Sequence, residues 1–188
     1  MTARRELLWL ACRDKTCCYA KVLVTGHDVR RICDALGVKP WDVAAACPAE
    51  PGPPDGFRLS PGGRLHQLAL VKRPGAGGAC TFLWKVNDGH AQCGLGALRP
   101  GVCQAYPAVF VDGLLCADSS ACTCRRWSVF DLDGDADREL LARLAAEQSE
   151  HAALVRRWNA ALPEERGRRT FRQFCAWLMD ACAGAAAP

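Results

Sequence analysis

Apolar side chains recur at helical spacing in several parts of the chain. The first such stretch begins after Thr25, a capping residue, and ends at Gly37, so a helix is predicted over 25–37. Its apolar stripe, at positions i, i+3, i+4 and i+7, consists of Val29, Ile32, Cys33 and Leu36. A second, short helix is predicted to begin at Pro40 and to end near Cys47, because Pro48 follows.

Two further amphipathic helices are predicted towards the C-terminal end of the sequence. One runs from Asp135 to about Ala160, and the acidic residues of its first turn favour the helix dipole. The other begins at Thr170, where Gln173 completes a capping-box pattern. Its apolar stripe consists of Phe171, Phe174, Cys175, Leu178 and Cys182.

Between these helices the pattern changes to short apolar runs separated by turn residues, which is typical of strands. Residues 65–71 and 79–84 are predicted to pair as one hairpin across the glycine-rich turn 74–78. Residues 109–115 predict a second small hairpin. Further turns are predicted at 87–89 and 95–98. We therefore expect an α+β fold, a helix-rich single domain with a small antiparallel hairpin.

The length of 188 residues and a hydrophobic fraction of 50% allow a core that needs no disulfide bridges. We expect a cysteine-cluster metal-binding domain over residues 1–130. The helices of residues 131–188 are expected to form a C-terminal extension that packs on it. The cysteine count of 13 is odd, so full pairing within one chain is impossible.

No targeting or membrane segment is predicted. The apolar run at 7–11 is interrupted by Arg13, and no stretch approaches the roughly 20 apolar residues of a membrane span. We expect a cytoplasmic protein with reduced thiols and no membrane partner. The net charge of +4 is too small for a dense basic face, which argues against nucleic acid as a partner. The richness in arginine and alanine favours a bacterial source.

The cysteines follow a pattern typical of a metal site. They sit on predicted loops and turns: before the first helix, inside the hairpin and around residues 95–98. Loops from distant parts of a chain can converge, and thiolates suit zinc and iron–sulfur centres. The candidate ligands are Cys12, Cys17, Cys18, Cys80, Cys93, Cys103, Cys122 and Cys124. The sequence does not decide whether Cys116 joins them, nor whether the metal is zinc, iron or an iron–sulfur cluster.

Four cysteine-bearing features, in the order in which they occur, resemble a known family. The pair Cys17-Cys18 is followed by a C-x-F-L segment at 80–83, by Cys93, and by an R-P-x-x-C-x-x-Y-P segment at 99–107. The order is similar to that of the YkgJ-type cysteine-cluster family, which is described as a zinc- or iron-chelating domain. The resemblance covers roughly residues 8–124 and implies a metal-binding role.

The first motif departs from the family pattern. It reads C-x4-C-C instead of C-x2-C-x2-C-C, so one usual ligand is missing, and Cys122 or Cys124 would fit a further downstream cysteine. The family includes flagellin lysine N-methylases, which makes a metal-dependent protein-modifying enzyme an alternative. No glycine-rich strand-turn-helix is present to bind S-adenosylmethionine. A thiol redox relay is a third hypothesis.

Other polar and sulfur-bearing residues have simpler interpretations. His90 lies near Cys93 and could replace a cysteine as a ligand, although an exposed turn histidine is the favoured interpretation. The acidic run 131–137 lacks the glycine and the final glutamate of a calcium loop. Cys47 is expected to be inert. The cysteines expected to act as small core hydrophobes are Cys33, Cys175 and Cys182.

Overall fold

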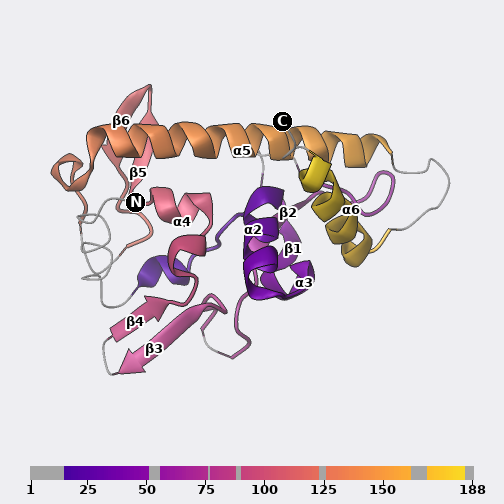
Figure 1. The fold of residues 1–188 in the computed structure, drawn as a ribbon, viewed down its shortest axis with the longest axis horizontal. Coiled ribbons are helices and arrows are strands. Elements are labelled where there is room, and N and C mark those ends of the chain that lie inside the picture. Colours follow the sequence, from indigo (N-terminus) through magenta and orange to yellow (C-terminus); the bar gives the residue numbers. More distant parts are fainter. Residues whose placement is uncertain are drawn as a thin grey trace. The chain divides into compact units, whose positions relative to one another are not determined.

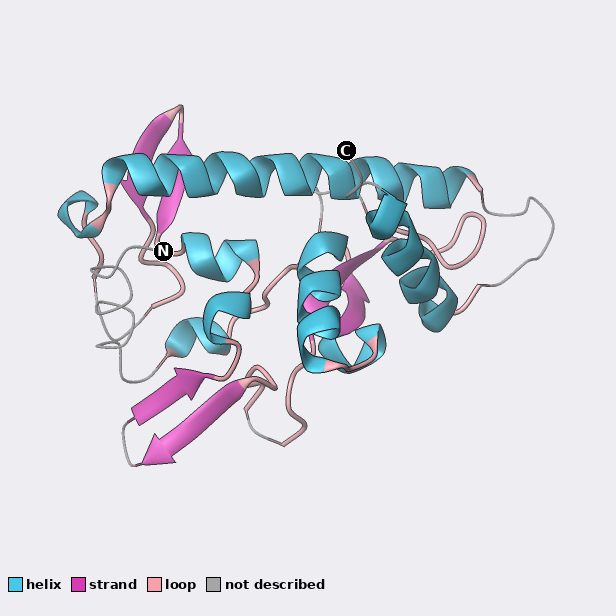
Figure 2. Ribbon diagram, viewed as in Figure 1, coloured by secondary structure: helices cyan, strands magenta, loops and turns pink. Residues whose placement is uncertain are grey.

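The structure, a computed structural model, describes residues 15–50, 56–75, 77–87, 90–122, 126–161 and 169–184. The fold is α+β, as the sequence predicts. In these residues helices alternate with three separate two-stranded antiparallel sheets, as Figures 1 and 2 show. Contacts within the chain gather in two compact units, residues 1–22 with 72–145 (unit 1) and residues 23–71 with 146–188 (unit 2). The division at residue 130 that we expect from the sequence stays a prediction.

Unit 1 is built from short elements that carry most of the candidate cysteines. Its first and last parts are the 3-10 helix η1 and the N-terminal part of the long helix α5 (Gly134–Ala160). The elements between them are β3 (Leu83–Asn87), β4 (His90–Cys93), η2 (Gly96–Leu98), α4 (Gly101–Ala105), β5 (Ala108–Val111), β6 (Leu114–Ala117) and η3 (Val129–Asp131). The η1 helix itself spans Thr16–Cys18. Strand β3 pairs with β4, and β5 pairs with β6, each in antiparallel register.

Unit 2 contains the larger apolar core. Its elements are α2 (Gly26–Leu36), α3 (Pro40–Val43), β1 (Ala44–Pro48), β2 (His66–Leu70), the C-terminal part of α5 and α6 (Phe171–Gly184). The rings of Phe57 and Phe174 stack with centroids 3.8 Å apart. Trp158 is buried against Phe174, and its Nε1–H donates to the Arg58 carbonyl at 2.7 Å.

The helix boundaries confirm the capping patterns read from the sequence. At the start of α2, the Thr25 hydroxyl accepts from the Asp28 amide, and the Asp28 carboxylate accepts from the Thr25 amide. Gly37 ends the helix with a left-handed φ of 64°. Thr170 and Gln173 form the same reciprocal arrangement before α6. Leu36 alone departs from the predicted stripe of α2, because it is 46% exposed.

The strand pairing differs from the prediction. The short helix that starts at Pro40 ends at Val43, and residues 44–48 form β1, which pairs with β2 instead of the expected partner at 79–84. Pairing partners override the weak strand propensity of alanine. Across the turn at 74–78, a single bridge joins Lys72 to Cys80.

Several other predicted elements are present, whereas the predicted turn at 87–89 includes residues 88 and 89, which lie outside the described residues. Helix α5 starts within one residue of the predicted position, and β5 and β6 form the predicted hairpin. The two residues of its turn, Asp112 and Gly113, both have positive φ, as an Asp-Gly hairpin requires. Within the described part of the chain, no helix is long and apolar enough to cross a membrane.

Candidate metal centre

The segments that carry the candidate cysteines are fastened to one another by hydrogen bonds within unit 1. The Cys80 amide donates to the Cys18 carbonyl at 2.8 Å, so the loop before β3 lies against η1. Lys72 Nζ donates to the same Cys18 carbonyl at 3.0 Å and to the carbonyl of Ala20. The Thr16 hydroxyl donates to the Ala121 carbonyl at 3.2 Å, which brings Cys122, the next residue, close to η1.

Cys17 and Cys18 interact directly through their side chains. The hydrogen bond from the Cys18 thiol, together with the charge of Lys15, lowers the pKa of Cys17 to about 7 against the opposing effect of burial. The same hydrogen bond and burial raise the pKa of Cys18 far above its usual value. Near neutral pH, Cys17 is therefore ionised in about half of the molecules, while Cys18 keeps its proton.

Three further cysteines lie within electrostatic range of this pair. The charges of Cys93 and Cys103 contribute to the raised pKa of Cys18. Burial raises the pKa of Cys80 and of Cys93, and the charge of Cys17 adds to both shifts. The five sulfur atoms thus form one interacting group, although they come from η1, the loop before β3, the end of β4, and α4.

Positive side chains act electrostatically on this group of sulfur atoms. Lys72 and Arg73 lower the pKa of Cys80, and Arg99 lowers that of Cys93, in each case opposing the effect of burial. Arg99 is 3% exposed, and its Nε–H donates to the Gly96 carbonyl at 2.8 Å. Lys15, which directly precedes η1, is 0% exposed. The sequence gives no signal for Lys15 as a site residue, because one lysine beside a cysteine motif is indistinguishable from a surface lysine.

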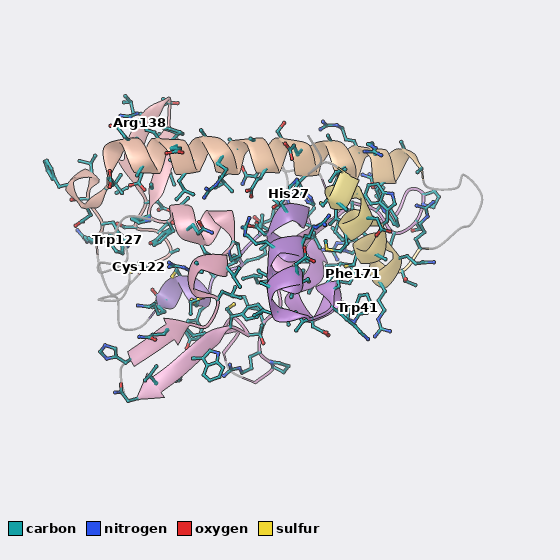
Figure 3. All side chains as sticks on the ribbon, in the orientation of Figure 1. His27, Trp41, Cys122, Trp127, Arg138 and Phe171 are labelled. Carbon is teal, nitrogen blue, oxygen red and sulfur yellow. The ribbon has the colours of Figure 1, made fainter. Side chains whose placement is uncertain are left out.

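Tyr106, Cys122 and Trp127 form a second part of the same neighbourhood. Burial, and then the charges of Cys122 and nearby acidic groups, raise the pKa of the Tyr106 hydroxyl. The Tyr106 ring meets the Trp127 ring edge-on with centroids 6.4 Å apart. Figure 3 labels Cys122 and Trp127, which come from the two sides of residues 123–125. Tyr106 therefore packs near Cys122, and the charge of Cys17 also reaches its hydroxyl.

The structure places the other cysteines differently. Cys12 and Cys124 lie outside the described residues. Cys116 is half-buried on β6, opposite Val109. Cys47 lies on β1, where its thiol donates to the Gln67 carbonyl at 3.3 Å. Three cysteines are buried in unit 2, as the sequence predicts for core residues: Cys33, Cys175 and Cys182.

None of the described histidines joins the sulfur group. His90 is exposed, as expected for a histidine at a turn. His151 is buried in unit 2, and its Nδ1 accepts from the Gly26 amide at 3.2 Å. His27, which Figure 3 labels on α2, lies 2.9 Å from a Glu150 carboxylate oxygen.

The acidic residues around the start of α5 cap helices. The Ser128 amide donates to Asp131, and the Asp133 amide donates to Asp137 at 2.9 Å. Both contacts satisfy amides at helix starts.

The donors suit a soft or borderline metal in type, but they do not surround a common point. Among the described residues, no three His, Cys, Asp or Glu side chains have the arrangement of metal ligands. The interacting sulfur atoms are nevertheless partly or fully buried, and buried thiolates are the usual ligands of zinc and iron–sulfur centres. Comparisons with known protein families, curated proteins and solved structures gave no match.

Proposed function

We propose that the protein binds zinc or iron, the latter as a bare ion or an iron–sulfur cluster, through the cysteines of unit 1. The proposal extends to a relationship with the YkgJ-type cysteine-cluster family, which the chain resembles in its cysteine motifs. The observation that supports it best is the mutual electrostatic interaction of Cys17, Cys18, Cys80, Cys93 and Cys103 across four separate segments. Cys12, Cys122 and Cys124 complete the proposed set of ligands.

A bound cation explains why so many thiols would gather in one place. Thiolates that lie close together raise one another's pKa, so the group without a cation is mostly protonated at neutral pH. A metal ion favours the thiolate form and releases the protons. The binding energy would add to the hydrogen bonds that already join η1 to the loop before β3.

The first test is the elemental composition of protein purified without oxygen. Zinc, iron and acid-labile sulfide are measured on the full chain. We expect a stoichiometric metal, either zinc without sulfide or iron with or without sulfide. Iron with sulfide identifies a cluster and favours a redox or sensing role. Protein that contains no metal and takes up neither zinc nor iron under reducing conditions would refute the proposal.

The second test removes two of the proposed ligands. The double substitution Cys17→Ser and Cys18→Ser should strip the metal, because serine is a poor ligand for soft or borderline ions. Cys47→Ser is the matched control, since a hydroxyl can keep the hydrogen bond to the Gln67 carbonyl outside unit 1. Metal content that is equal in the double variant and in the control would contradict the assignment.

The Cys17–Cys18 contact also supports a second candidate, a thiol redox relay. A thiolate with a pKa near 7 is a competent nucleophile towards a disulfide at neutral pH. With a low-molecular-weight disulfide as oxidant, Cys17 forms a mixed disulfide and releases one thiol. A second cysteine of the chain then displaces the other. Mass spectrometry after alkylation decides this case: reversible disulfides in metal-free protein favour the relay, and their absence refutes it.

A further inference from the structure

The hairpin formed by β5 and β6 carries apolar side chains on both of its faces. One face contains Ala108, Leu115 and Ala117 and belongs to an apolar cluster with residues of α5, beside which the hairpin lies in Figure 1. An antiparallel sheet that meets only water on its second face has polar side chains there. The second face of this hairpin, here called the outer face, instead consists of two apolar cross-strand pairs, Val109 with Cys116 and Val111 with Leu114.

The outer face is exposed at the end near the turn. Leu114 is 69% exposed and Val111 is 51% exposed, so the described part of the chain leaves both side chains largely in water. Val109 and Cys116, which lie further from the turn, are half-buried. Removing apolar surface from water is the main favourable contribution to protein association, and adjoining exposed apolar side chains mark sites of such contact. The outer face therefore has the character of a contact surface for another protein chain.

The surroundings of the outer face are acidic. Residues 112–139 contain seven aspartate and glutamate residues against three arginines, which gives this segment a net charge of −4. Asp112, in the turn between β5 and β6, is exposed directly beside Val111. Strand β6 also contacts η3, the short helix that precedes the acidic first turn of α5. A surface that complements the outer face would thus combine apolar side chains with positive charge.

Strand β3 of the same unit has these properties. Trp84 is 66% exposed, Val86 is also exposed, and the exposed Lys85 lies between them in sequence. The Trp84 indole is supported by the chain after β4, because a Cβ at Gly94 would lie 2.8 Å from its Nε1. Residues 72–99 contain four basic residues against one carboxylate, Asp88, a net charge of +3. Trp84, Lys85 and Val86 are here called the β3 surface.

We propose that the β3 surface of one copy of the chain docks on the outer face of the β5–β6 hairpin of a second copy. Trp84 and Val86 would cover Leu114 and Val111, and Lys85 would lie near the acidic turn. Every copy carries both surfaces, so the complementary partner is always present at the same concentration. The proposal concerns the unit of the proposed metal centre but does not depend on a bound metal.

Charge also determines the arrangement of the copies. Two identical surfaces placed together would bring two basic or two acidic segments into contact, and like charges across an interface are unfavourable. The contact therefore joins two different surfaces, which makes the association head-to-tail, and it can add further copies unless a ring closes. Both surfaces are small, so the association should be weak and reversible, as in transient complexes.

Sedimentation velocity of the reduced full-length chain tests this association. The reductant prevents disulfides between the Cys116 thiols of two copies. We expect the average mass to rise with protein concentration at low salt. The association should weaken in sodium chloride at about 1 M, where the Debye length falls to about 3 Å. A chain that stays monomeric at low salt up to its limit of solubility would overturn the proposal, and so would an association that salt does not weaken.

Substitutions on each surface test the contact itself. Leu114→Ser alters the outer face, and Trp84→Ser alters the β3 surface. Each should weaken self-association at least about tenfold, because large side chains at the centre of an interface contribute most of its affinity. Leu36→Ser is the matched control, since Leu36 is an exposed leucine on α2 of the other unit. An equal effect of all three substitutions would argue against the two surfaces.

A mixture of the two variants tests the head-to-tail arrangement. Leu114→Ser keeps its β3 surface, and Trp84→Ser keeps its outer face. The equimolar mixture should therefore form dimers of one copy of each variant and nothing larger, although neither variant associates alone. A mixture that behaves like the two separate variants would overturn head-to-tail docking.

Circular dichroism checks that the variants fold. Should Leu114→Ser or Trp84→Ser fail to fold, Val111→Thr and Val86→Thr replace them, because threonine keeps the β-branched shape that suits a strand. The outcomes also separate this inference from the proposed function. A chain that binds metal but does not self-associate overturns this inference alone. A chain that self-associates in the expected way but binds neither zinc nor iron overturns only the proposed function.

Discussion

His151 should make the stability of the protein fall steeply with acid. Its imidazole is 6% exposed, and Nδ1 accepts the Gly26 amide proton, which requires the neutral ring. Burial, and then the nearby His27, lower the pKa of His151 to about 4, while Asp28 acts in the opposite direction. The next residue along the helix, Glu150, pairs with His27.

The sign and the size of this change in stability follow from the difference between the pKa of His151 in the folded and in the unfolded state. The unfolded chain has the ordinary histidine pKa of 6.5, so it takes up a proton that the folded state refuses. Above pH 6.5 the effect is absent, and it grows as the pH falls towards the folded pKa of about 4. The free energy of unfolding should decrease by about 2 kcal/mol at pH 5 and by about 3 kcal/mol at pH 4 from this residue alone.

The assay is denaturant unfolding of wild type and of His151→Gln between pH 7.5 and pH 4. Glutamine stays neutral and offers an oxygen to the Gly26 amide. The difference between the two free energies should therefore change by about 2 kcal/mol between pH 7.5 and pH 5. His90→Gln, at an exposed histidine, should parallel wild type. A difference between wild type and His151→Gln that stays constant over this range would refute the reasoning.

Two further predictions concern helix starts. Thr25→Ala removes the cap of α2 and leaves the buried Asp28 with one partner fewer. The free energy of unfolding should therefore fall by about 1–2 kcal/mol in unfolding experiments. Thr170→Ala, at the exposed cap of α6, should lose less. Equal losses of stability in the two variants would contradict the importance of the burial of Asp28. Gly26→Ala places a Cβ 2.8 Å from Cys182 Sγ and 2.9 Å from Leu178 Cδ1, so it should destabilise by about 1–3 kcal/mol. Gly134→Ala, at the start of α5, meets nothing within 4 Å and should be neutral or slightly stabilising. A larger loss of stability in Gly134→Ala than in Gly26→Ala would argue against the close packing at Gly26.

Helices were predictable from this sequence because their signals are local. Thr25 and Asp28, or Thr170 and Gln173, are three residues apart, and the hydrogen bonds that they form lie within the same turn. The same holds for Gly37 and for the Asp-Gly turn between β5 and β6. Each of these signals acts within a single turn, which is why these boundaries agree to within a residue or two, whereas the helix from Pro40 ends at Val43 and not near Cys47.

The pairing of β1 with β2 could not be predicted in the same way. Ala44, Ala45 and Ala46 carry helix propensity, and their partners on β2 are 22–26 residues away, across a proline-rich stretch. The apolar run of β2 identifies a strand, but nothing in it specifies which segment pairs with it. The nearer candidate at 79–84 meets residue 72 through the bridge from Lys72 to Cys80, and its last two residues pair with β4 instead of β2.

The candidate site shows why residue type and residue environment carry different information. The cysteine motif named Cys17, Cys18, Cys80, Cys93 and Cys103, and the structure shows that their charges interact. The cysteine motif could not indicate that Lys15 is buried near these cysteines, because burial depends on how η1 packs in unit 1. A thiolate centre needs a balanced charge as much as it needs sulfur ligands, since uncompensated charge is expelled from a protein interior. The cysteine spacing therefore predicts candidate metal ligands, whereas the burial of the charged side chains near them is seen only in the structure.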